Sequence, residues 1–307
     1  MEKALITGGA GFIGSNLAEM LLERDVDVKI LDSMYLGTPE NLEGLDVEII
    51  EGSVMDMEKV REAVEGCDTV FHNAARSSAP MHKEDPAEGA RINIEGFINV
   101  VEEAMDQDVE KVVYASTSSM YGSVEPPHKE DMGEKPTNRY SASKMARELY
   151  ADVYAQKGLD ITGIRYFSVY GPREKAKGRF ANVISQFLWS MLDGESPKIF
   201  GDGEQTRDFT FVKDIARANI LAAEKGEAGQ YYNIGTETET SFNTVVEKLN
   251  EELGTDIEPE KVDNPIKNYV RRTRSDTSRA KEDLGYEPEY SFEEGLKETV
   301  EYYRDQN

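Results

Sequence analysis

Tyr140 and Lys144 have the spacing of a proton-transfer pair, in the segment Tyr-Ser-Ala-Ser-Lys. Residues four apart lie on one face of a helix, and the sequence predicts a helix over residues 141–156. An ammonium group beside a phenol stabilises the phenolate and lowers the tyrosine pKa from about 10. Tyr140 is therefore a candidate general acid and base near neutral pH. The spacing alone also fits a solvated helix face, so the prediction depends on the residues around the pair.

Hydroxyl side chains follow the predicted strand at residues 111–115, in the run Ser116, Thr117, Ser118 and Ser119. Ligands of open α/β sheets bind at the carboxyl ends of the strands. A hydroxyl at this edge can hold a substrate oxygen beside the tyrosine. A simple polar loop is the alternative, but the strand, the hydroxyl run and the Tyr/Lys pair converge on one site.

The segment from Thr7 to Gly14 has the pattern of a phosphate-binding loop, with glycines at positions 8, 11 and 14. These three glycines permit a tight turn, close approach of the backbone to a pyrophosphate, and close packing of helix on strand. The helix N-terminus that follows favours phosphate groups. Asp32 ends the next apolar run, where it can bind ribose hydroxyls and would repel a 2′-phosphate. The loop therefore predicts NAD rather than NADP, against the alternative of an ordinary strand–helix turn.

The elements that must position these residues alternate along the first half of the chain. Apolar runs and helical patterns predict strands and helices in turn, with strands at about 3–6, 26–31, 47–50, 69–71, 111–115 and 160–166. They also predict a long helix at about 87–105. This alternation indicates an α/β fold with a Rossmann-type, doubly wound parallel sheet. Beyond residue 166 glycine and proline interrupt the chain, and a smaller mixed α/β C-terminal substrate lobe is expected, closed by a helix at about 292–303.

The composition argues against several other classes of protein. The 307 residues are 38% hydrophobic, enough for a buried core, and the net charge of −25 disfavours binding to nucleic acid or an anionic membrane. One cysteine, Cys67, and three histidines make a disulfide within the chain or a zinc site unexpected. We see no membrane-length apolar run and no signal-peptide pattern, so a cytoplasmic location is expected. Adaptation to high internal salt is a further hypothesis for the acid excess.

Motifs along almost the whole chain, in the same order, resemble the extended short-chain dehydrogenase/reductases, and the UDP-glucose 4-epimerase group most of all. The segments that carry this resemblance are TGGAGFIGSNL (7–17), HNAA (72–75), STSSMYG (116–122), YSASK (140–144), RYFSVYGPRE (165–174), FGDGEQTRDFTFVKD (200–214) and DTSRAKEDLGYEP (276–288). The resemblance implies an NAD-binding Rossmann domain over 1–167, with returning segments at about 212–236. Residues 168–211 and 237–307 are then expected to form a nucleotide-sugar-binding lobe.

The resemblance also implies an activity, the C4 epimerisation of a UDP-sugar through a transient 4-keto sugar. The sugar is expected to be glucose or galactose, or one of their N-acetylhexosamine forms. By position, Tyr140 matches the family's base, Lys144 the residue that tunes it and holds the nicotinamide ribose, and Thr117 the substrate-orienting hydroxyl.

Other nucleotide-sugar reactions stay open as alternatives. The related 4,6-dehydratases carry Thr-Asp-Glu where this chain has Thr117, Ser118 and Ser119, and UDP-glucuronate decarboxylases usually keep a glutamate at the third position. Two hydroxyls cannot replace the acid and base that elimination needs. These absences favour epimerisation over dehydration, decarboxylation or reduction. A non-catalytic NAD-binding protein is less expected, because the Tyr/Lys pair and Thr117 are intact.

The resemblance assigns further contacts by position. Expected cofactor contacts are Gly8, Gly11, Phe12, Ile13, Gly14, Asp32, Ser33, Ser53, Val54, Ala74, Ala75, Ser77, Asn93, Ser116, Tyr140, Lys144, Tyr166 and Phe167. Expected substrate contacts are Ser78, Thr117, Tyr140, Ser168, Asn182, Val183, Phe200, Arg207 and Arg271.

Arginines are the expected ligands of the substrate diphosphate, because a guanidinium binds phosphate through two hydrogen bonds. Arg207 matches the family's first such arginine, and Arg271, Arg272 and Arg274 form a cluster in which the second is expected. Surface ion pairing with the abundant acids is the alternative for that cluster. Ser168 departs from the family's usual asparagine, so its contact is expected to be weaker or bridged by water. No metal is expected, and a homodimer is predicted through the helices near 90–105 and 141–156.

Overall fold

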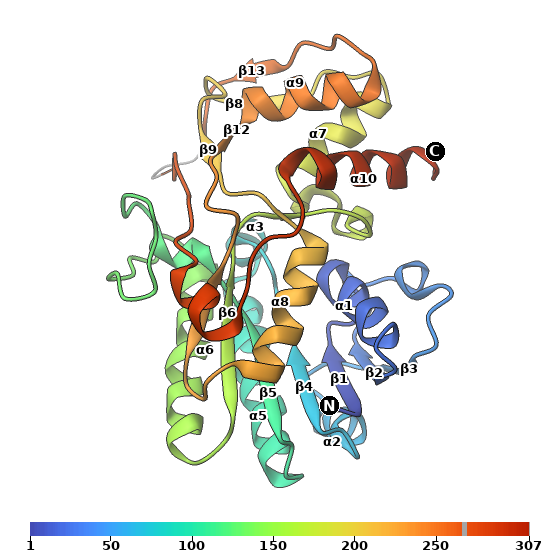
Figure 1. Ribbon diagram of the computed structural model, residues 1–307, viewed down its shortest axis with the longest axis vertical. Coiled ribbons are helices and arrows are strands. Elements are labelled where there is room, and N and C mark those ends of the chain that lie inside the picture. Colours follow the sequence, from blue (N-terminus) through green and yellow to red (C-terminus); the bar gives the residue numbers. More distant parts are fainter. Residues whose placement is uncertain (266–268, 307) are drawn as a thin grey trace.

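The computed structural model describes residues 1–265 and 269–306. Its centre is a seven-stranded parallel sheet in the order β11-β6-β5-β4-β1-β2-β3 (Figure 1). The strands are β1 (Lys3–Thr7), β2 (Asp27–Asp32), β3 (Glu48–Glu51), β4 (Thr69–His72), β5 (Lys111–Thr117), β6 (Ile161–Tyr166) and β11 (Tyr231–Ile234). The predicted α/β fold with a doubly wound parallel sheet is thereby confirmed.

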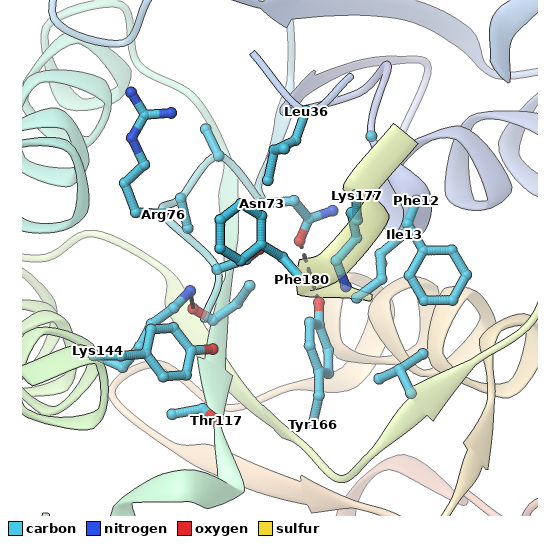
Figure 2. A pocket seen from close by; sticks show the side chains of 18 of the residues that line it. Phe12, Ile13, Leu36, Asn73, Arg76, Thr117, Lys144, Tyr166, Lys177 and Phe180 are labelled. Atoms are coloured by element: carbon cyan, nitrogen blue, oxygen red, sulfur yellow. Dashed lines mark hydrogen bonds between the residues drawn. The ribbon is translucent and has the colours of Figure 1, made fainter. Parts of the chain in front are cut away.

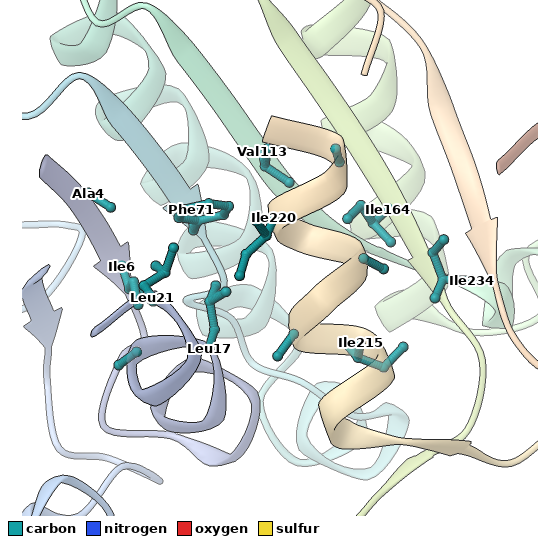
Figure 3. Packing of buried hydrophobic residues seen from close by; sticks show 14 of the residues in the cluster. Ala4, Ile6, Leu17, Leu21, Phe71, Val113, Ile164, Ile215, Ile220 and Ile234 are labelled. Atoms are coloured by element: carbon teal, nitrogen blue, oxygen red, sulfur yellow. The ribbon is translucent and has the colours of Figure 1, made fainter. Parts of the chain in front are cut away.

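Apolar side chains on both faces of the sheet explain why these short runs form central strands. In β1, Ala4 and Ile6 enter one apolar cluster and Leu5 enters the cluster on the opposite face. Successive strand residues point to opposite sides, so an uninterrupted apolar run is suited to a sheet covered twice. Figure 3 shows the first cluster, in which Ile215 and Ile220 of a helix pack over the sheet.

Helices cover the two faces. The first cluster draws on α1 (Phe12–Leu22) and α8 (Val212–Lys225), and the second on α2 (Met57–Val64), α5 (Gly96–Asp106) and α6 (Arg139–Gln156). Short helical segments complete this part of the chain: η1 (Pro39–Leu42), α3 (Ala79–Glu84), α4 (Pro86–Ala90), η2 (Arg91–Glu95) and η3 (Ser118–Tyr121).

The predicted helix over 87–105 is helical throughout, but it is not one regular α-helix. A π-helical turn, η2, separates α4 from α5 and carries the buried Asn93. The Asn93 side chain accepts a hydrogen bond from the backbone N–H of Arg76 at 2.8 Å and donates to the hydroxyl of Ser143 at 2.9 Å. Extra residues in a π-turn are frequent near functional sites, and this one ties the loop after β4 to α6.

A smaller lobe lies above the carboxyl end of the sheet (Figure 1). A third apolar cluster joins its helices. The helices of the lobe are η4 (Lys175–Phe180), α7 (Val183–Leu192), α9 (Phe242–Leu253) and α10 (Phe292–Arg304). It also contains two short strand pairs. In the first, β8 (Lys198–Phe200) pairs with β13 (Glu260–Val262), and in the second, β9 (Thr206–Arg207) pairs with β12 (Thr240–Ser241).

The chain returns from the lobe to the sheet. β7 (Val169–Tyr170) pairs with β10 (Thr210–Phe211), then α8 packs on α1, and β11 joins the edge of the sheet beside β6. After β11 the chain forms η5 (Ala280–Leu284) against the same face. The exact domain boundaries stay a prediction. No helix within the described residues is long and apolar enough to cross a membrane.

Candidate active site

A cavity of about 830 Å³ runs along the carboxyl ends of the strands. The strand order reverses between β1 and β4, which is where ligands bind in open α/β sheets. We call the part lined by the loops after β1 to β5, together with Tyr140 and Lys144, the sheet half. The lobe half is lined by residues Lys177, Phe180, Ala181, Asn182, Arg207, Tyr269, Val270 and Thr273.

The glycine loop between β1 and α1 forms one wall of the sheet half, through Gly8, Gly11 and Gly14. Gly8 has a positive φ of 70°, and an added Cβ there would lie 2.9 Å from the backbone nitrogen of Ala74. An added Cβ on Gly14 would overlap the carbonyl oxygen of Gly8. Both positions therefore need glycine, and the loop presents its backbone and the N-terminus of α1 to the cavity. Phe12 and Ile13 begin that helix and line the same wall (Figure 2).

Asp32 is held at the end of β2 with its carboxylate in the cavity wall. It accepts hydrogen bonds from the backbone N–H groups of Ala10 at 3.0 Å and Met34 at 2.9 Å. Gly37 leaves room beside it, since an added Cβ there would lie 2.8 Å from either carboxylate oxygen. Burial raises the pKa of Asp32, and the backbone donors oppose that change. A ligand hydroxyl in this space can donate to the carboxylate.

Thr117, Tyr140 and Lys144 meet between the two halves (Figure 2 labels Thr117 and Lys144). Asn138 caps α6 by accepting from the backbone N–H of Ser141 at 2.9 Å, which fixes the start of the helix that carries Tyr140. The Thr117 hydroxyl is hydrogen-bonded to Tyr140. The ammonium of Lys144 donates to the carbonyl of Ala115 at 2.8 Å. The three predicted catalytic side chains therefore line one surface.

The electrostatics of Tyr140 differ from the sequence-based expectation. Burial raises the pKa of Tyr140, while the hydrogen bond from Thr117 and the charge of Arg147 oppose that rise. From the sequence we expected the ammonium of Lys144 to lower the pKa of Tyr140. Burial, helped by the charge of Arg147, instead lowers the pKa of Lys144 well below its usual range. The Lys144 amine is therefore less readily charged than an exposed lysine, which reduces its ability to lower the pKa of Tyr140.

Arg207 is a cation of the lobe half for which the described residues provide no acidic partner. Its guanidinium donates to the backbone carbonyl of Thr206 at 2.7 Å and lies 5.3 Å from the ring centre of Tyr269. Among the described residues, none of the ion pairs includes Arg207. Burial lowers its pKa, and the contact with Tyr269 opposes that change. A half-buried guanidinium without a carboxylate is suited to an anionic ligand group.

Most predicted contacts line the cavity, and the rest are placed outside it. Phe167 is buried beneath the site, and Phe200 lies on the lobe with 41% of its surface exposed. The side chain of Arg271 is exposed and pairs with Asp202 at 3.0 Å. The predicted residues outside the lining are Asn93, Phe167, Ser78, Val183, Phe200 and Arg271. Arg272 also forms a surface ion pair, with Glu239 at 2.7 Å. Surface ion pairing was the alternative to diphosphate binding for this arginine cluster.

Several lining residues were not predicted. Arg76 stacks on the ring of Tyr35, 3.4 Å from its centre, so two loops meet across the mouth of the sheet half. Lys177 pairs with the buried Glu174 at 2.6 Å and lies over the ring of Phe12. No local motif marks these residues, because they come together only through the fold. Arg147, buried behind the site, could have been found by its spacing of seven residues from Tyr140 on the same helix.

Known proteins resemble the chain over its full length. UDP-N-acetyl-α-D-glucosaminuronate decarboxylase of Bacillus cytotoxicus is 36% identical over 99% of this chain and 98% of its own. UDP-glucose 4-epimerase of Mycolicibacterium smegmatis is 36% identical over 99% of each chain. The crystal structure of UDP-glucose 4-epimerase from Thermotoga maritima with UDP-glucose superimposes with a TM-score of 0.94 at 38% identity, over 99% of each chain. The model of the NAD dependent epimerase/dehydratase family matches residues 4–235, and the chain belongs to that family.

Proposed function

We propose that the protein is an NAD-dependent epimerase that inverts C4 of a UDP-sugar. The observation that carries the proposal is the position of Tyr140, with Thr117 hydrogen-bonded to it, between the sheet half of the cavity and the lobe half that contains Arg207. The similarity to enzymes that are named UDP-glucose 4-epimerases supports the same activity. UDP-glucose, UDP-galactose and their N-acetylhexosamine counterparts are the proposed substrates.

The sheet half fits NAD. The space that Gly8 and Gly14 keep open at the start of α1 suits a pyrophosphate, and the carboxylate of Asp32 suits the adenosine ribose. NAD bound there would supply the hydride acceptor, and in its reduced form the hydride donor, that inversion at C4 requires. Because the cofactor is regenerated in each turnover, it need not leave the protein.

The chain's own residues move the proton and hold the sugar. Tyr140 takes the proton of the sugar 4-hydroxyl during oxidation and gives it back during reduction. Thr117 orients the same oxygen through its hydroxyl. Arg207 supplies positive charge for the diphosphate of the substrate, which the surface of a chain with net charge −25 otherwise repels. Ser168 and Asn182 line the same region.

Elimination or decarboxylation is less well supported. Within the described lining, the acidic residues are Asp32 and Glu88, and neither belongs to the segment at 117–119. Glu88 lies near the guanidinium groups of Arg76 and Arg91, at 3.9 and 3.5 Å. Among the described lining residues, no carboxyl group is therefore placed beside Tyr140 to act as the second acid or base that dehydration needs.

We also infer a cytoplasmic homodimer. Leu149, Tyr150 and Val153 of α6 are 60%, 42% and 48% exposed, a concentration of apolar surface on an otherwise charged chain. Together with α5 this face is expected to pack on a second copy. Leu149→Glu combined with Val153→Glu should convert a dimer to a monomer in light scattering. A parent protein that is already monomeric at micromolar concentration would contradict this part of the proposal.

Proton NMR of the purified protein with UDP-glucose, and separately with UDP-N-acetylglucosamine, tests the proposed activity. New anomeric signals from the C4 epimer, with the substrate mass unchanged in mass spectrometry, are expected. A product lighter by water or carbon dioxide would favour the alternatives. No conversion of either sugar, even with NAD added, would contradict the proposal for these substrates.

A further inference from the structure

Arg147 is a fully buried arginine on the helix that carries Tyr140 and Lys144. It lies three residues after Lys144 and seven after Tyr140, so the three side chains leave α6 on the same side. Burying a guanidinium is costly, and such groups are usually paired with a carboxylate. The position of Arg147 therefore needs an explanation.

Three backbone carbonyls surround the Arg147 guanidinium. It donates to the carbonyls of Asn93, of Ala74 at 2.9 Å and of Ala115 at 3.5 Å. Ala74 follows β4 and lines the sheet half, Asn93 lies in the π-turn η2, and Ala115 belongs to β5 just before the hydroxyl segment. One side chain thus joins the three segments that hold the catalytic end of α6. The Ala115 carbonyl is the same one that accepts from Lys144.

Arg165 provides a contrast within the same protein. It is also buried, but two carboxylates neutralise it, Glu134 at 2.7 Å and Glu148 at 2.6 Å. Among the described residues, none of the ion pairs includes Arg147. Its partners are dipoles, so its positive field is not cancelled locally and acts on neighbouring groups in a medium of low dielectric.

We propose that Arg147 is a positioning residue of the catalytic centre, whose unneutralised charge favours the phenolate form of Tyr140 while its guanidinium fixes the segments around the cavity. The inference rests on the proposed role of Tyr140 as the base. Arg147 itself lies outside the cavity lining and acts through Tyr140.

The effects of this charge on its neighbours agree with the geometry. It opposes the rise in the pKa of Tyr140, and it contributes to the lowered pKa of Lys144. Burial lowers the pKa of Arg147 to about 10, and the nearby phenols oppose that change. The other titratable groups around this pair are His72 of β4, His82 of α3, Tyr114 of β5, Glu148 of α6 and Tyr166 of β6.

Direct titration of Tyr140 tests the proposal without any turnover. Tyrosines are replaced by 3,5-difluorotyrosine, whose phenol ionises at lower pH, and the ¹⁹F signal of Tyr140 is assigned by its loss in Tyr140→Phe. In NAD-saturated protein, Arg147→Met should raise the pKa of Tyr140 by about one unit, since it removes a nearby opposite charge. Arg217→Met, which removes a mostly buried arginine that is paired with Asp214 and Glu289 outside the cavity lining, should leave it unchanged. An unchanged Tyr140 pKa in folded Arg147→Met would overturn the proposal.

Two further variants keep the test valid if Arg147→Met does not fold. Arg147→Gln keeps hydrogen-bond donors without charge, and Arg147→Lys keeps a charge with different donors. The pKa of Tyr140 should be higher in Arg147→Gln than in Arg147→Lys, and equal values would contradict the proposal. Thermal unfolding of each variant establishes that it is folded.

The pH dependence of turnover supplies the second test. In Arg147→Met, kcat/KM should be roughly tenfold below the parent value on the rising side of its pH profile and should recover at higher pH, because the fraction of phenolate changes tenfold per unit. A uniform loss at every pH would mean that Arg147 has a structural role only. If the parent shows no epimerase activity, the proposed function fails, but the ¹⁹F titration still decides the role of Arg147.

Discussion

The two halves of the cavity are built in different ways. In the sheet half, ligand groups are expected to meet backbone and short side chains at the end of a strand or the start of the next helix, such as Asp32 and Gly14. In the lobe half, Arg207 and Tyr269 come from segments more than 60 residues apart that meet only through the fold. The comparison teaches that a site made of backbone turns is encoded locally, whereas a site made of long side chains depends on the whole fold.

Gly14→Ala gives the largest expected effect on the sheet half. The added Cβ overlaps the Gly8 carbonyl, so the loop must shift, and overpacking of this kind costs about 1–3 kcal/mol. We expect NAD affinity to fall by roughly 100-fold or more, because the backbone amides that approach the pyrophosphate move. Isothermal titration measures this. Gly133→Ala, where an added Cβ meets nothing within 4 Å, is the matched control and should bind NAD like the parent.

Arg207→Met tests the lobe half. A charge-assisted contact to a diphosphate contributes about 1.5–3 kcal/mol, so affinity for UDP and UDP-glucose should fall by roughly 10- to 100-fold. NAD affinity should stay at the parent value, because Arg207 lines the other half. Loss of both affinities together would mean that the halves are not independent.

Acidification should weaken NAD binding by about tenfold through Asp32. An exposed aspartate has a pKa of about 3.9. Because burial raises the pKa of Asp32, this carboxyl takes up its proton at a higher pH than an exposed aspartate does. The contribution to affinity is therefore present above the raised pKa and is lost as the pH falls through it. Titrations between pH 7 and pH 4.5 measure it, and Asp32→Asn should bind weakly without this pH dependence. A parent affinity that stays constant over the same range would remove Asp32 from the ribose site.

Arg271→Met is expected to have the smallest effect. The side chain is exposed and paired with Asp202, and surface ion pairs contribute about 0–1 kcal/mol. Affinity for UDP-glucose should change by no more than about twofold. A loss as large as that of Arg207→Met would restore Arg271 as a diphosphate ligand and would show that the segment rearranges when substrate binds.

The sequence predicted the sheet half well, since its signals are local. The glycine spacing, Asp32 at a strand end and the Tyr140/Lys144 pair are each contained in one short segment, and the structure places them along one cavity. The predictions for Phe200 and Val183 rested on looser alignment, and both lie outside the lining. Arg76 and Lys177 could not be predicted, because their position follows from loops that meet only in three dimensions.

The fold likewise has features that follow from local sequence and features that follow only from tertiary contacts. Short apolar runs predicted six of the seven strands of the sheet, and β11 lies within the returning segment expected at about 212–236. Periodicity alone did not reveal the π-turn within the predicted helix at 87–105, because one additional residue in a turn barely changes the apolar pattern. That turn places Asn93 against the loop after β4, a contact that only tertiary structure defines.

Turnover of Tyr140→Phe decides most directly whether Tyr140 transfers the proton. The variant lacks one hydroxyl at the junction of the two halves, so it should bind NAD and UDP-glucose with affinities close to the parent values. Its rate of C4 epimerisation, followed by proton NMR, should fall by about 10²–10⁴-fold, the usual contribution of a positioned acid and base. Epimerisation at a rate near that of the parent protein would show that Tyr140 is not the proton-transferring group and would contradict the account.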